Sequence, residues 1–250
     1  MEIYGGRAGY NSVRFTSEKY EAISRFTKGE ITIETRMRKR EKKILVMLSK
    51  IPFVRSFTLI AEIIIEYWKR FLLVIMLFLM EFLLFGNANS YTIPINALVM
   101  LCFSLIIIGI IIKITSIGKY HAAEHMAANA YDKDPNLTLE TVKKQPRTHK
   151  NCGTNLVIPI FISFFILFIV FGDPFWVYLV SWSVGYELWR NEPKIFWLAV
   201  LVIGKVAQYV LFTSKPKEKH LNVAIEAIKK LEEKELGGQR YKDPEKKRTI

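Results

Sequence analysis

The sequence predicts a mainly α-helical, polytopic membrane protein with about four transmembrane helices, a small N-terminal β-hairpin unit and a cytoplasmic helical hairpin. Three observations predict this fold class. Long apolar stretches recur through the middle of the chain, basic residues gather at only some of the segments between them, and a short alternating pattern precedes the first stretch.

The first predicted unit, residues 1–50, combines a β-hairpin with a basic linker. Residues 20–26 and 30–35 are predicted strands, because Ile31 and Ile33 alternate with polar residues as in a strand with one wet face. Three residues, "TKG", connect the strands and end on glycine, as a bulged hairpin requires. The run "RMRKREKK" that follows is interpreted as a solvated linker near the membrane surface.

Residues 51–212 are predicted to form the transmembrane domain. Residues 93–112 contain no charged side chain over 20 positions, which is long enough to cross a bilayer core as a helix. Three comparable apolar stretches are residues 71–85, 155–171 and 195–212, the last interrupted only by Lys205 and Gln208. These stretches predict four crossings.

Two further segments of this domain mix apolar and polar residues. Residues 51–67 carry Arg55, Glu62 and Glu66, and we expect an amphipathic helix on the inner leaflet. Residues 175–188 number 14, the length of a re-entrant or interfacial segment. We favour four crossings, which keep the basic tail inside; a crossing by residues 175–188 would make five and place the tail outside.

The distribution of basic residues predicts the orientation of the chain. Of the 36 Lys and Arg residues, 15 lie in residues 1–70, 7 in residues 113–153 and 11 from residue 213 onward, whereas the turns at 86–92 and 172–174 carry none. By the positive-inside rule, we expect a multi-pass protein of the cell membrane with both termini and the central loop in the cytoplasm.

The same charges predict the partners. The lipid bilayer with its anionic inner leaflet attracts such basic segments, and other membrane proteins are the expected protein partners. No nucleic-acid partner is expected, because the basic residues do not form an aromatic-rich patch on one soluble face.

The tail, residues 213–250, is predicted to be cytoplasmic and to contain an amphipathic helix. An apolar stripe runs along that helix, made of Leu221, Ala224, Ile225, Ile228 and Leu231. We expect the stripe to pack on the cytoplasmic subdomain or to lie on the membrane. The pair Gly237-Gly238 predicts the end of the helix.

The predicted cytoplasmic hairpin, residues 118–154, carries the candidate site. His121 and His125 in "YHAAEH" share one face of a helix, because they are four residues apart. With Glu124 they form the H-x-x-E-H pattern of inverted zincins, in which the histidines bind zinc and the glutamate activates water. His149 and Cys152 in "RTHKNCGTN" have spacing that lets both side chains point one way. The four His and Cys side chains predict a divalent metal site, zinc in type.

The role of the metal stays open at this level. Four protein ligands would fill a tetrahedron and make a structural site, whereas three leave a place for water. In the open site Glu124 is the candidate general base, and in the closed site it orients an imidazole. Cys152 is available as ligand or nucleophile, because Cys102 is predicted to lie mid-membrane and a reducing compartment argues against a disulfide.

Glu187 and Arg190 in "GYELWR" are further candidate site residues. An ionisable residue at membrane depth is a functional hypothesis by default, and Glu187 is expected near the histidine hairpin. The alternative is that Glu187 and Arg190, three residues apart on a helix, form an ion pair that has only a structural role.

These motifs together resemble the signature of the YqhQ family, multi-pass membrane proteins of bacteria and archaea whose function is unknown and which are described as predicted metal-dependent enzymes. The family pattern is roughly Tyr-His-Gly-Ala-Glu-His, then Leu-Thr-Val-Glu-Asn, then Arg-Leu-His-Pro-Arg-Cys-Gly-Thr. It falls on residues 120–125, 137–141 and 147–154. The segments "KIPFVRSFTLIAE" and "GYELWR" extend the likeness. The chain departs from the pattern at Asn11, where the family has glutamate, and at Arg7, where it has glutamine.

Two functions are compatible with these features. The first is a metal-dependent hydrolase in which activated water attacks a carbonyl or phosphoryl group of a membrane protein or lipid. The alternative is a non-enzymatic membrane scaffold or regulator whose metal is structural, and Asn11 favours it. Whether the protein is an enzyme therefore stays open.

Overall fold

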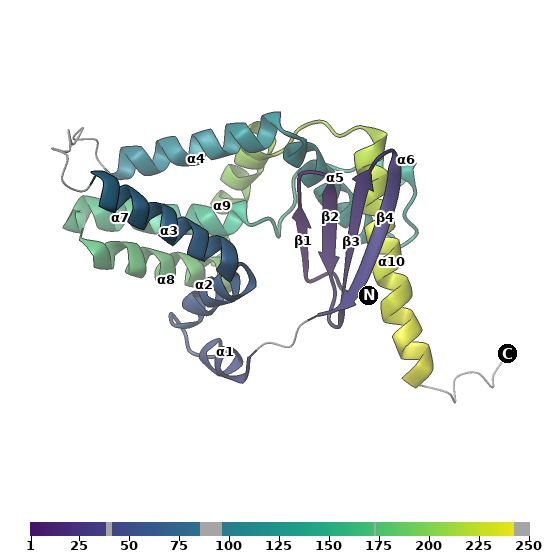
Figure 1. Ribbon diagram of the computed structural model, residues 1–250, viewed down its shortest axis with the longest axis horizontal. Coiled ribbons are helices and arrows are strands. Elements are labelled where there is room, and N and C mark those ends of the chain that lie inside the picture. Colours follow the sequence, from purple (N-terminus) through teal and green to yellow (C-terminus); the bar gives the residue numbers. More distant parts are fainter. Residues whose placement is uncertain (39–41, 86–96, 173, 243–250) are drawn as a thin grey trace. The chain divides into compact units, whose positions relative to one another are not determined.

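The computed structural model describes residues 1–38, 42–85, 97–172 and 174–242 (Figure 1). The predicted turn at 86–92, the start of the predicted crossing 93–112 and part of the basic linker lie outside these residues. The chain forms two compact units. The first contains Met1–Arg40, Ser104–Asn155 and Leu198–Ile250, and the second contains Glu41–Phe103 and Leu156–Trp197.

The first unit contains a four-stranded antiparallel sheet in the order β1-β2-β3-β4. The strands are β1 (Gly5–Ala8), β2 (Ser12–Thr16), β3 (Tyr20–Thr27) and β4 (Glu30–Met37). The predicted hairpin of the last two is confirmed, but its predicted three-residue connection is wrong. Thr27 pairs with Glu30. The connection is therefore Lys28-Gly29, with φ of 54° and 91°, as in the tight turn whose twist matches the strands.

Two helices, α5 (Ser116–Tyr131) and α10 (Glu218–Lys242), pack on this sheet (Figure 1). Alternation in β2 directs Val13 and Phe15 into the shared core, where both are fully buried. The predicted stripe of α10 lies in the same core: Leu221, Ala224, Ile225, Ile228 and Leu231. Of the two placements expected for this stripe, packing on the protein is confirmed.

The predicted end of the tail helix at Gly237-Gly238 is wrong, because α10 continues to Lys242. A glycine inside a helix costs only about 1 kcal/mol relative to alanine. Since the preceding turns of α10 are held by the core, the helix is already nucleated when it reaches the glycines.

Helix α5 leaves α4 (Ala97–Ile114) at an angle of 81°. Gly118 lies inside this bend, where a Cβ would be 2.7 Å from the carbonyl oxygen of Ile112. Its own carbonyl accepts a hydrogen bond from the Ser214 amide at 3.0 Å. The absence of a side chain at Gly118 therefore allows the sharp bend between α4 and α5, the helix that carries the histidines. A short helix follows it, α6 (Leu139–Lys143), which is capped by Thr138.

The second unit contains α1 (Lys43–Leu48), α2 (Arg55–Glu66), α3 (Trp68–Phe85), α8 (Phe175–Asn191) and most of α7 (Thr154–Phe171). Helices α7 and α8 approach closely at Gly185, where a Cβ would lie 2.3 Å from the Cα of Ile160. Such small residues are typical of close helix contacts in membrane proteins.

Glu187 of α8 holds the turn that precedes α2. Its carboxylate accepts hydrogen bonds at 2.8 Å from the Phe53 amide and at 2.8 Å from Nε of Arg55. The proposed pair between Glu187 and Arg190 is thus replaced by a pair between Glu187 and Arg55. The turn, in which Phe53 has a φ of 64°, brings the Arg55 guanidinium to the carboxylate in bidentate geometry.

Two helices of the described chain are long and apolar enough to cross a membrane, namely Thr154–Phe171 and Lys194–Phe212. The second joins α9 (Lys194–Ala207) to a π-helical turn, η1 (Gln208–Phe212). A third span results if the bent pair Cys102–Ile114 and Ser116–Tyr131 counts as one. The structure is therefore compatible with a membrane protein.

Candidate metal centre

The candidate site is centred on α5 in the first unit. Alanines make up much of this helix, and they combine high helix propensity with a small cross-section that lets almost every side of it be buried. The four-residue spacing places His121 and His125 on one face, with ring centroids 4.3 Å apart. Glu124 lies beside them and is 6% exposed.

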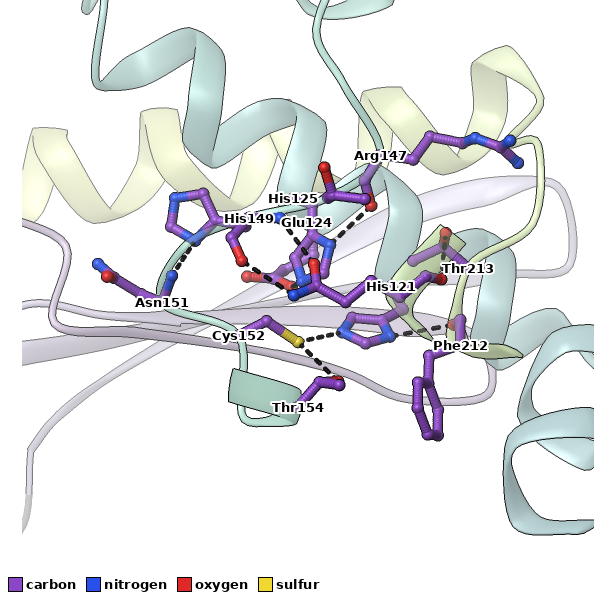
Figure 2. A network of polar contacts seen from close by, with 12 residues as sticks. His121, Glu124, His125, Arg147, His149, Asn151, Cys152, Thr154, Phe212 and Thr213 are labelled. Atoms are coloured by element: carbon purple, nitrogen blue, oxygen red, sulfur yellow. Dashed lines mark hydrogen bonds and ion pairs between the residues drawn. The ribbon is translucent and has the colours of Figure 1, made fainter. Parts of the chain in front are cut away.

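Cys152 joins these two histidines to form a cluster of three donors, called the His121–His125–Cys152 cluster below. Its Sγ lies 3.5 Å from Nε2 of His121, and donor atoms of all three residues lie within 4.8 Å of one another (Figure 2). Zinc bonds of about 2.0 Å to nitrogen and 2.3 Å to sulfur, at a tetrahedral angle, separate two donors by about 3.5 Å. The Cys152–His121 distance therefore fits two ligands of one tetrahedral ion.

Backbone carbonyls orient both imidazoles of the cluster. Nδ1 of His121 lies 3.2 Å from the carbonyl oxygen of Phe212, and Nδ1 of His125 lies 2.8 Å from that of Arg147 (Figure 2). A carbonyl only accepts hydrogen bonds, so each Nδ1 carries the proton and each Nε2 keeps its lone pair. This is the arrangement that metal-bound histidines adopt in proteins.

Burial controls the protonation of these groups. It lowers the pKa of His121 and His125 and raises the pKa of the Cys152 thiol. Burial also raises the pKa of the Glu124 carboxyl to about 8. A thiol with a raised pKa is a poor nucleophile, and a bound cation would deprotonate it outright. The surroundings of Cys152 thus favour a ligand over a nucleophile.

His149 lies next to the His121–His125–Cys152 cluster but is not part of it. Its ring centroid is 5.9 Å from that of His125. Its Nδ1 accepts a hydrogen bond from the Asn151 amide at 3.3 Å (Figure 2). Its Nε2 is buried without a hydrogen-bond partner among the described residues, and lies 3.6 Å from the nearer oxygen of Asp132. Burial lowers the pKa of His149, and Asp132 opposes that shift. The predicted set of four therefore comes together as three donors and a neighbouring histidine.

Two asparagines hold the loop that carries His149 and Cys152. Asn129 donates to the carbonyls of Pro146 and Thr148 at 3.1 and 2.9 Å. Asn155 donates to the carbonyl of Lys150 at 2.7 Å. Sequence reasoning missed both residues, because single asparagines near a turn are too common to indicate a partner.

The π-helical turn η1 supports the site from a distant part of the sequence. Gln208 accepts from the His149 amide at 2.8 Å and donates to the His149 carbonyl at 3.2 Å. The last residue of η1, Phe212, supplies the carbonyl that binds His121. Insertions of π-helix are frequent at functional sites. The one signal in the sequence was Gln208 itself, a polar residue inside an apolar stretch.

The His121–His125–Cys152 cluster opens into a pocket of about 100 Å³. Glu124, Asp132 and His149 line it together with the chain at Ile3, Tyr4, Gly5 and Gly6. Strand β1 therefore forms one wall of the site, which the sequence did not indicate. Asn11 does not line the pocket, and its side chain donates to the carbonyl of Phe26 at 3.3 Å. Glu187 and Arg190 belong to the second unit.

Comparison with known proteins identifies relatives. A family model described as "Protein of unknown function (DUF1385)" matches residues 9–234. The "Uncharacterized protein YqhQ" of Bacillus subtilis (strain 168) is 27% identical over 130 residues, which cover 47% of this chain and 41% of that protein. The match thus spans less than half of that relative's length. No solved structure matches.

Proposed function

The chain belongs to the DUF1385 family, as its resemblance to YqhQ proteins predicted, and we propose that it is an integral membrane metalloprotein that hydrolyses a membrane protein or lipid. In this proposal about four helices cross the bilayer, and both termini and the site face the cytoplasm. The two or three apolar helices and the placing of the basic residues support it.

One observation carries the proposal for the site. Three donors, from His121, His125 and Cys152, gather in a pocket that also contains the buried carboxyl of Glu124. Three protein ligands leave one position of a tetrahedral zinc ion open, which is the pattern of catalytic sites.

The residues divide the work of hydrolysis as follows. His121, His125 and Cys152 hold a divalent ion, which when bound acidifies water and polarises the substrate oxygen. Glu124 takes the proton that the attacking water loses and passes it to the leaving group. The surroundings of Glu124 suit both steps. A nearby cation favours the carboxylate that accepts the proton, and burial favours the protonated carboxyl that then donates it.

The test is Glu124→Gln in the full-length protein, purified in detergent. Bound metal is measured by elemental analysis, and hydrolysis is screened with peptide, acyl-ester and phosphodiester substrates in vesicles. We expect full metal content and loss of hydrolysis. Glu140→Gln is the control, because that carboxyl is 74% exposed on α6. Unchanged hydrolysis in Glu124→Gln would refute the role of Glu124.

A structural site is the second candidate function, and the presence of the His149 imidazole in the lining of the same pocket favours it. If His149 became a fourth ligand, the shell would be closed, and the protein would act as a scaffold or regulator of other membrane proteins. X-ray absorption of the zinc-loaded protein separates the two, since a closed shell contains three nitrogens, one sulfur and no water oxygen.

A further inference from the structure

The ring of His149 offers a buried hydrogen-bond donor whose nearest acceptor among the described residues, Oδ2 of Asp132, lies 3.6 Å away and makes no hydrogen bond with it. Because Nδ1 accepts from the Asn151 amide, the ring proton is on Nε2. That nitrogen is buried, and among the described residues it has no hydrogen-bond partner. The imidazole lines the same pocket as the His121–His125–Cys152 cluster. A buried donor of this kind is costly unless a ligand completes it.

Hydrogen bonds hold both the ring and the backbone of His149: the Asn151 amide donates to Nδ1, and Gln208 binds the backbone. Gln208 bonds both the amide and the carbonyl of His149, and Gln208 is itself 1% exposed. A donor fixed in this way is preorganised toward whatever oxygen enters the pocket. The tautomer also argues against a metal bond, because a nitrogen that carries a proton has no lone pair to offer an ion.

The charges around the pocket indicate which chemical group of a substrate the pocket can accept. Its lining includes the carboxyl groups of Glu124 and Asp132, and no Lys or Arg is present among the residues that the structure places there. Sites that transfer phosphoryl groups bind them with Lys, Arg or several metal ions, since the substrate arrives with negative charge. A neutral carbonyl meets no such repulsion, and gains negative charge only as water adds to it.

We propose that the site acts on the carbonyl of an amide or ester and that His149 donates a hydrogen bond from Nε2 to the carbonyl oxygen. This inference rests on the proposed function and narrows it from acyl or phosphoryl substrates to acyl substrates. Water adds its oxygen to the carbonyl carbon and gives a proton to Glu124. The bond from carbon to the amine or alcohol then breaks, and the leaving group receives the proton, so that one water yields an acid and an amine or alcohol.

The experiment uses the full-length protein loaded with cobalt(II), whose visible absorption reports the ligands of the ion. The probes are acetohydroxamate, which presents a carbonyl and an anionic oxygen, and inorganic phosphate. We expect acetohydroxamate to bind more tightly than phosphate. His149→Ala should weaken acetohydroxamate roughly tenfold to hundredfold while leaving cobalt content and the spectrum without probe unchanged. His149→Gln should restore part of the affinity, because its amide also offers an N–H.

Other outcomes overturn the inference in distinguishable ways. Tighter binding of phosphate would assign the pocket to phosphoryl groups, and equal affinity of acetohydroxamate in His149→Ala would remove the donor role. Loss of cobalt in both variants would make His149 a ligand and favour the closed site. A wild-type protein that binds no cobalt would refute the proposed function itself. His220→Ala is the control, because His220 belongs to the same unit and is not among the residues lining the pocket.

Discussion

Gly6 and Glu124 are so close that a Cβ on the glycine would lie 1.9 Å from Oε1 of the glutamate. The two residues are far apart in the sequence, but β1 and α5 pack together and bring them face to face. The absence of a side chain at position 6 makes room for the carboxyl that the proposed chemistry requires. Gly6 is therefore part of the site's construction.

Gly6→Ala should displace the Glu124 carboxyl or push β1 away from α5. Overpacking of this kind typically costs about 1–3 kcal/mol in the free energy of unfolding. Gly5→Ala is a matched control in the same strand, since a Cβ there meets nothing within 4 Å. Thermal unfolding in detergent should show a lowered midpoint for Gly6→Ala and little change for Gly5→Ala. Equal midpoints would mean that β1 is not held against Glu124.

Cys152→Ala and His121→Ala should each abolish zinc binding at stoichiometric concentrations. Either change removes one of three ligands and leaves a site with two, which is too few for a stable zinc site. The check is elemental analysis after purification with one equivalent of zinc. His220→Ala should keep its zinc, because that imidazole packs against Tyr120 with a centroid distance of 4.7 Å and does not line the pocket. Zinc retained in both cluster variants would refute the ligand assignment.

The composition of the site could be predicted from the sequence, because its main signals are local. The spacing of His121 and His125 places them on one helix face wherever that helix lies. His149 and Cys152 were grouped with them by residue type, by their place in the same predicted hairpin and by a spacing that lets both side chains point one way. The structure brings Cys152 into the cluster and leaves His149 beside it. That difference depends on the direction of each side chain in the loop, which spacing does not determine.

Elements with a strong hydrophobic period were predicted from the sequence, and elements too short to show a period were missed. The stripe of α10 and the hairpin of β3 and β4 have clear periods. Strand β1 has only 4 residues, two of them glycine, and its pairing with β2 depends on contacts that no local pattern contains. The support from Gln208 was equally hidden, since it requires η1 to lie against a loop about 60 residues earlier in the chain.

Gly185→Leu should strongly destabilise the second unit, because the Cα of Ile160 lies 2.3 Å from where the Cβ of a new side chain would be. Backbone cannot move aside as a flexible side chain can, so α7 and α8 must separate. We expect loss of folded protein in detergent, measured by size-exclusion chromatography. Gly237→Leu is the control, as a Cβ there meets nothing within 4 Å. Normal folding of Gly185→Leu would show that these helices do not pack at this point.

Glu124 should give the chelator-treated protein a specific dependence of stability on pH. Burial raises the pKa of its carboxyl in the folded protein from 4.5 to about 8, so the folded state holds a proton that the unfolded state has released. This contribution is complete below pH 4.5 and is lost as the pH rises through about 8. The buried histidines, with lowered pKa values, oppose this slope below about pH 7.5, because they bind protons more readily in the unfolded state. The contribution of Glu124 is therefore measured as the difference between the wild type and Glu124→Gln.

Between about pH 5.5 and 7, Glu124 is protonated in the folded state and ionised in the unfolded state, and there it should contribute a fall of about 1.4 kcal/mol per pH unit to the free energy of unfolding. Glu124→Gln should remove this slope and be more stable than the wild type at pH 8, as measured by chemical denaturation in the presence of chelator. Adding zinc should remove the slope from the wild type as well, since a cation beside the carboxyl favours its ionised form. Parallel pH profiles for Glu124→Gln and the wild type would show that Glu124 is not held in a buried, protonated state.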